Sequence, residues 1–134
     1  MSNANALPRR SPRFVGAIDQ GTTSNRFILF DESGSPVISI AREHKQYFPS
    51  SGLVEHDVEE IWECTVDVIR DALAGVGAAP SDLSSVGITN QRETIVVWHA
   101  DTGKAYHNAI VWQDQRGAAL CEELAAKSTL GINW

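Results

Sequence analysis

Two polar clusters in this 134-residue sequence carry side chains that could bind phosphate oxygens and the hydroxyls of a small polyol. The first spans residues 19–26 and reads Asp-Gln-Gly-Thr-Thr-Ser-Asn-Arg. Its glycine lets the backbone approach a ligand closely, while hydroxyls, free N–H groups and the guanidinium can donate to phosphate oxygens. Asp19 could hold Mg²⁺ against the same oxygens, directly or through water. The segment therefore predicts a phosphate-binding turn, and a polar hairpin turn without a ligand is the alternative.

The second cluster, Asn-Gln-Arg-Glu at residues 90–93, follows a strand-like run at residues 85–89. In open sheets with crossover helices, ligands gather at the carboxyl ends of the strands. Arg92 as donor and Glu93 as acceptor could bracket the hydroxyls of a small polyol. An exposed ion pair, which contributes little to stability, is an equally open alternative.

Hydrophobic patterning predicts the elements that must position both clusters. Apolar runs at residues 14–18 and 27–30 flank the first cluster and predict a tight β-hairpin. A third strand is predicted at residues 37–42, with a pattern that extends towards Tyr47, so that three strands form an antiparallel meander. Further strand-like runs occupy residues 85–89, 94–98 and 109–112.

Two helices complete the predicted α/β fold. Asp57 is a good N-cap, Glu60 stands where a capping box requires it, and apolar residues follow at three- and four-residue spacing as far as Val76. Pro80 ends this helix, and a second helix is predicted over residues 114–127. The order β-β-β-α-β-β-β-α, with a right-handed crossover onto the same sheet, predicts a mixed sheet with helices packed on it.

Composition narrows the class of protein. The net charge is −6, and no run of basic residues interleaves with aromatic ones, so we expect no nucleic-acid binding. No apolar stretch approaches membrane-spanning length, so no membrane span is expected. Cys64 and Cys121 lack the spacing of metal ligands, and free thiols fit a reducing, cytoplasmic setting. Residues 1–13 are polar and lack the apolar segment of a secretory signal, so we expect a disordered leader before a domain at residues 14–134.

Four motifs occur in order along the chain: Asp-Gln-Gly-Thr-Thr-Ser at 19–24, Val-Glu-His-Asp at 54–57, Gly-Ile-Thr-Asn-Gln-Arg-Glu-Thr at 87–94, and Asn-Ala-Ile-Val-Trp-Gln-Asp at 108–114. Together they resemble the amino-terminal part of the FGGY carbohydrate kinases, from about Val15 to Gly131. The resemblance implies a ribonuclease H-like fold of the actin/Hsp70/hexokinase superfold. The Gln-Arg-Glu-Thr sequence points, within that family, to kinases of glycerol over those of pentuloses.

The resemblance also implies a chemistry: transfer of the γ-phosphoryl group of ATP, with Mg²⁺, to glycerol, giving sn-glycerol 3-phosphate. Four residues resemble those that contact the nucleotide phosphates in the family: Thr22, Thr23, Ser24 and Arg26. Asp19 resembles the acidic residue near Mg²⁺, and Arg92 and Glu93 resemble the pair that hydrogen-bonds the glycerol hydroxyls. Trp112 resembles the indole that packs on the glycerol carbons, and a core tryptophan is its open alternative.

The sequence also departs from the family pattern. Leu53 stands where Trp is common and Val58 where Pro is usual, while Gln115 and Gly117 alter the run after the last motif. Family members are several times longer and have two domains that close on a cleft. The resemblance therefore implies an incomplete first domain whose catalytic general base lies beyond Trp134, inactive or nearly so as an isolated polypeptide. Full-length relatives commonly form homo-oligomers.

Two other interpretations stay open from the sequence. The chain could belong to a kinase of the same family that acts on another polyol or sugar. It could also be a non-catalytic nucleotide-binding or oligomerising module, which would have a compact fold without an apolar surface left for a missing partner.

Overall fold

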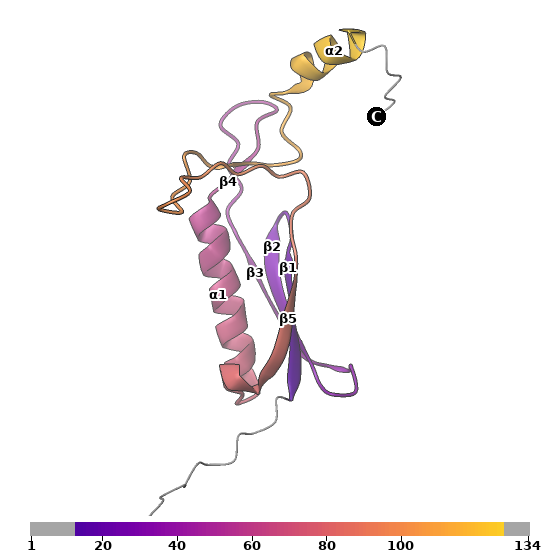
Figure 1. The fold of residues 1–134 in the computed structure, drawn as a ribbon, viewed down its shortest axis with the longest axis vertical. Helices are drawn as coiled ribbons and strands as arrows, with labels where there is room; N and C mark the ends of the chain where they lie inside the picture. The colour runs from indigo at the N-terminus through magenta and orange to yellow at the C-terminus, as the bar shows by residue number, and fades with distance from the viewer. Residues whose placement is uncertain (1–12, 128–134) are drawn as a thin grey trace, which may run out of the picture.

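The structure, a computed structural model, describes residues 13–127 (Figure 1). The strands are β1 (Phe14–Gln20), β2 (Ser24–Phe30), β3 (Pro36–Glu43), β4 (Glu55–His56), β5 (Leu83–Thr89) and β6 (Ala109–Ile110). The helices are α1 (Val58–Gly75) and α2 (Ala118–Lys127), and a 3₁₀ turn, η1, spans Pro80–Asp82. Residues 1–12 of the predicted leader lie outside the described part. Arg13 donates its backbone N–H to the carbonyl of Asp82 at 2.8 Å.

The main sheet has four strands in the order β3-β2-β1-β5. β1 is antiparallel to β2 and parallel to β5, so the predicted mixed sheet and the crossover onto it are confirmed. The hairpin strands run further into the polar segment than the pattern predicted, because Asp19 pairs with Arg26 and Gln20 with Asn25. Only residues 21–23, called the tip from here on, remain outside the strands.

α1 covers one face of this sheet and closes the core (Figure 1). The buried side chains of this core come from β2 and α1: Phe27, Leu29, Val68, Ala72 and Leu73. Asp57 caps the helix as predicted, accepting from the N–H of Glu59 at 2.9 Å. The predicted capping box is wrong, because Glu60 accepts from the backbone N–H of Lys45 at 2.8 Å and so ties the helix to the segment after β3.

Gly16 allows β1 to lie close to the buried ring of Phe27. Gly16 is buried in β1, in the face that Phe14 and Ile18 share. A Cβ at this position would lie 2.5 Å from Cζ of Phe27 and 2.7 Å from its Cε2. The missing side chain therefore makes room for the Phe27 ring between β1 and α1.

The later part of the chain differs from the predicted β-β-α order. Residues 94–98 form no strand, and make single bridges from Ile95 to Ile110 and from Trp98 to Ala105. The chain turns away from the sheet after β5, where Glu93 has a φ of 60°. β6 is shorter than predicted and pairs with β4 in a separate two-stranded sheet.

α2 begins four residues later than predicted, at Ala118. The carboxylate of Asp114 accepts from the backbone N–H of Val54 and from Arg116, and these bonds hold residues 114–116 in a turn. Figure 1 shows α2 projecting beyond the small sheet, away from α1. Within residues 13–127, neither helix has the length and hydropathy that a membrane span requires.

Candidate functional site

The two polar clusters meet because β1 and β5 are parallel neighbours. Parallel strands end at the same edge of a sheet, and the register places Asp19 opposite Thr89. A cavity of about 550 Å³ opens at this edge. Residues 19–22 line it from the first cluster, Thr89 from the end of β5, residues 90–93 from the second cluster, and Trp112 from the loop after β6. Its volume falls in the range typical of small-ligand sites, about 300–1,000 Å³.

The structure separates the predicted phosphate-binding residues into two groups. Asp19 and Thr22 line the cavity, whereas Thr23, Ser24 and Arg26 are not among its lining residues. Arg26 pairs with Asp19 across the hairpin, so both exposed side chains stand on the face of the hairpin that points away from α1. This arrangement sets one cation and one carboxylate on neighbouring strands of the same face, and of the two only Asp19 lines the cavity.

Trp112 joins the second cluster to the first. Its side chain is 53% exposed, so the alternative of a core tryptophan is wrong. Its indole Nε1 donates a hydrogen bond to Oγ1 of Thr22 at 3.0 Å, across 90 positions of sequence. The indole therefore stands as one wall of the cavity and orients a hydroxyl of the tip.

An ion-pair network holds the loop that carries Trp112. Arg116 bonds the carboxylate of Glu55 at 2.7 Å and that of Asp114 at 2.8 Å. These bonds to Arg116 lower the pKa of both carboxyl groups below their usual values. Both side chains are nearly inaccessible to solvent, with 9% and 1% of their areas exposed. The paired charges tie β4 to residues 114–116 and so place Trp112.

Glu93 has an unusual backbone in the second cluster. Its φ of 60° lies in the left-handed region, and it is the one residue other than glycine with a positive φ among those the structure describes. Such a conformation costs a residue with a side chain roughly 1–2 kcal/mol. Strained residues of this kind concentrate at binding sites, where the backbone is held so that a side chain can be aimed.

Three further residues contact the tip, and no sequence pattern predicted a role for them. Gln91 donates from Nε2 to the carbonyl of Gly21 at 3.0 Å. His44 approaches the same carbonyl through Nε2 at 3.3 Å, and Gln46 donates to the carbonyl of Thr22 at 2.9 Å. The sequence carried only a weak signal for these three residues, because polar residues just after a strand are common. The contact of residues 44–46 with the tip follows from the fold alone.

The metal-binding capacity of the described region is small. Residues 13–127 contain no group of three or more His, Cys, Asp or Glu side chains placed to hold one ion. Asp19, exposed in the cavity wall, offers a single carboxylate. This donor set fits Mg²⁺, which keeps several waters and is commonly held by one or two carboxylates together with phosphate oxygens.

Comparisons with known proteins agree with this geometry. Residues 14–131 match the N-terminal domain of the FGGY family of carbohydrate kinases. The chain is 57% identical over 113 residues to a glycerol kinase of Methylobacterium radiotolerans, covering 84% of this chain and 23% of that protein. It is 58% identical over 113 residues to glycerol kinase 1 of Pseudomonas aeruginosa, again covering 84% of this chain and 23% of the relative.

Solved structures give the same result. The crystal structure of Plasmodium falciparum glycerol kinase with ADP matches with a TM-score of 0.78 and 35% identity, covering 89% of this chain and 24% of that one. Xylulose kinase from Rhodospirillum rubrum matches with a TM-score of 0.74 and 26% identity, over 87% of this chain and 24% of that one. The chain thus spans about a quarter of the length of the relatives it matches. The resemblance in the four motifs is confirmed, and the chain belongs to the FGGY family of carbohydrate kinases.

Proposed function

We propose that this chain is the part of an ATP-dependent glycerol kinase that receives the nucleotide phosphates and one side of glycerol. The whole enzyme would convert ATP and glycerol to ADP and sn-glycerol 3-phosphate. The observation that carries the proposal is that residues 19–22 line the same cavity as Arg92, Glu93 and Trp112. The names of the relatives that are 52–58% identical, all glycerol kinases, support glycerol over other substrates.

The tip and its neighbours would bind the phosphates of ATP. Thr22, which lines the cavity, would donate its N–H, and Thr23 and Ser24 would supply hydroxyls beside it. Arg26 would neutralise phosphate charge from the hairpin face, where it stands beside Asp19. Asp19 would contact hydrated Mg²⁺, which when bound neutralises phosphate charge and positions the transferring group.

The second cluster would hold glycerol. The guanidinium of Arg92 can donate to two vicinal hydroxyls, and the carboxylate of Glu93 can accept from them. The exposed indole face of Trp112 offers apolar contact to the carbon chain. This part of the chain would therefore position the reactants, since phosphoryl transfer depends mainly on alignment and charge neutralisation.

We also propose a cytoplasmic location. The thiols of Cys64 and Cys121 are both free, which suits a reducing compartment. ATP as the phosphoryl donor suits the same compartment.

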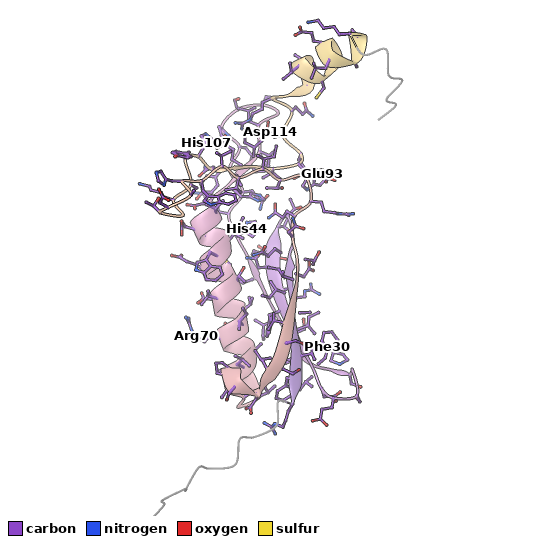
Figure 2. The ribbon with its side chains drawn as sticks, viewed as in Figure 1. Phe30, His44, Arg70, Glu93, His107 and Asp114 are labelled. Carbon is purple, nitrogen blue, oxygen red and sulfur yellow. The ribbon has the colours of Figure 1, made fainter. Side chains whose placement is uncertain are left out.

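The test is a titration of the ¹⁵N-labelled chain with glycerol, followed by NMR at the Trp112 indole and the Glu93 amide. We expect saturable shifts at both, and a five- to tenfold weaker affinity in Arg92→Ala and in Glu93→Gln, since a hydrogen bond contributes about 0.5–1.5 kcal/mol. Arg70→Ala is the matched control, because Arg70 is an exposed arginine on α1 that pairs with Asp67, away from the cavity (Figure 2).

The outcomes separate the open interpretations. Unchanged glycerol affinity in both site variants would refute the glycerol assignment. Shifts with xylulose in place of glycerol would assign the cavity to another FGGY substrate. Shifts at the tip with Mg·ATP, without any response to either polyol, would favour a non-catalytic nucleotide-binding module.

A further inference from the structure

The three carbonyl groups of the tip are all occupied by donors from other parts of the chain. Gly21 accepts from Nε2 of Gln91 at 3.0 Å and from Nε2 of His44 at 3.3 Å. Thr22 accepts from Nε2 of Gln46 at 2.9 Å. Thr23 accepts from the backbone N–H of His44 at 3.3 Å. Most of these donors come from residues 44–46, so the carbonyls of the tip face that segment.

The orientation of these carbonyls fixes where the neighbouring N–H groups point. No cis peptide bond occurs among the described residues, and in a trans peptide the N–H is antiparallel to the preceding C=O. The N–H groups of Thr22 and Thr23 therefore point away from residues 44–46. A carbonyl turned the other way would present partial negative charge to a phosphate oxygen, whereas these amides present donors.

A buried histidine sets the orientation of Gln46. His56 is fully buried, and its Nε2 lies 2.7 Å from Oε1 of Gln46. Since an amide oxygen only accepts, His56 carries its proton on Nε2, and the amide nitrogen of Gln46 is left to face Thr22. His44 packs edge-on against His56, with ring centroids 4.7 Å apart and an angle of 78° between the rings.

The position of His56 ties these contacts to β4 and to the start of α1. It lies in β4, directly before Asp57, which caps α1. Figure 2 shows His44 near the end of the sheet from which the Glu93 loop leaves. The Val-Glu-His-Asp motif at residues 54–57 thus contributes a buried side chain that reaches the tip through one intermediate residue, Gln46.

We propose that His44, Gln46 and His56, called the anchoring cluster here, are positioning residues for phosphate binding. They hold the carbonyls of the tip away from the ligand and keep the amides of Thr22 and Thr23 free to donate. The inference rests on the proposed binding of phosphates by the tip. A purely structural role, in which the cluster only satisfies buried polar groups, is the alternative that the experiment must separate.

Two pairs of variants test the proposal. Gln46→Glu is isosteric and keeps an acceptor for His56, but it loses the donor to Thr22, and Gln46→Met loses both. His56→Leu removes the donor to Gln46, whereas His56→Gln retains an N–H donor and should restore binding. Val68→Ala is the control, because Val68 is a fully buried core residue outside the anchoring cluster.

The readout is the dissociation constant of Mg·tripolyphosphate, measured by ¹⁵N NMR at the tip amides at a temperature where every variant is folded. We expect Gln46→Glu, Gln46→Met and His56→Leu to bind about five- to tenfold more weakly, and His56→Gln to bind within about twofold of the original chain. Equal binding by all variants, or equal weakening by Val68→Ala, would overturn the proposal.

A second measurement needs no ligand and keeps the two proposals separate. The ¹⁵N order parameters of the Thr22 and Thr23 amides should fall from about 0.85 towards about 0.6 in Gln46→Met, with the strand amides of β1 unchanged. If the original chain fails to bind the probe, the proposed function is wrong, and the order parameters alone decide whether the cluster anchors the tip. Unchanged order parameters in Gln46→Met would refute the anchoring itself.

Discussion

The close approach of Gly16 and Phe27 gives a prediction that combines two substitutions. Gly16→Ala places a methyl group 2.5 Å from Cζ of Phe27, which is closer than any real contact, so the ring or the strand must move. Overpacking of this kind costs about 1–3 kcal/mol. Phe27→Leu removes the outer ring atoms of a fully buried side chain, at a cost of about 1–2 kcal/mol, below the 3–5 kcal/mol typical of Phe→Ala.

The double variant is the informative one. Additive effects would lower the free energy of unfolding by about 2–5 kcal/mol. Phe27→Leu removes the atoms with which the new methyl group collides. We therefore expect the free energy of unfolding of the double variant to fall by at least about 1 kcal/mol less than the sum of the two single effects.

Urea unfolding of the original chain, both single variants and the double variant measures this coupling from the midpoints at constant m. Gly87→Ala is the control: Gly87 lies in the neighbouring strand β5, and nothing lies within 4 Å of a Cβ there. Its effect should be neutral or slightly stabilising. Additivity of the Gly16 and Phe27 effects within about 0.5 kcal/mol would refute the packing argument.

Three further predictions concern titratable groups. Burial lowers the pKa of His56, so the unfolded chain binds this proton more readily than the folded chain does. The free energy of unfolding should therefore fall as the pH drops below 6.5. Urea midpoints measured against pH should show this loss of stability, and the loss should be smaller in His56→Gln. Arg116→Met should lower the melting temperature and raise the pKa of Glu55, read by ¹³C NMR. Iodoacetamide should modify exposed Cys121 well before Cys64, whose pKa is raised by burial; equal rates would contradict the fold.

Local patterns predicted the parts of the fold that local forces decide. The apolar runs on either side of the first cluster form the hairpin, and Asp57 caps α1, because both features depend on neighbours in sequence. The crossover rule then predicted that residues 85–89 return to the same sheet, and the observed parallel pairing of β5 with β1 brings Arg92 and Glu93 to the edge where the tip lies.

Residues 94–98 show where such patterns fail. Their apolar side chains resemble a strand, yet Ile95, Val97 and Trp98 are 58–62% exposed. The turn at Glu93 directs them away from the sheet edge, and a left-handed φ at a glutamate has no signature in the sequence. The hydrogen bond between Trp112 and Thr22 could not be predicted from the sequence either. It joins residues 90 positions apart and depends on the ion pairs that place the loop carrying Trp112.

The hydrogen bonds that join the two clusters also limit how the molecule can move. Gln91 bonds Gly21, and Trp112 bonds Thr22, so a hinge between the two halves of the cavity would have to break both contacts. The side proposed to bind phosphates and the side proposed to bind glycerol would therefore move as one rigid body. In an enzyme that closes on its substrates, this rigid body would move relative to the part of the enzyme that faces it across the cavity. The distance between the two proposed binding positions inside the rigid body would not change during closure.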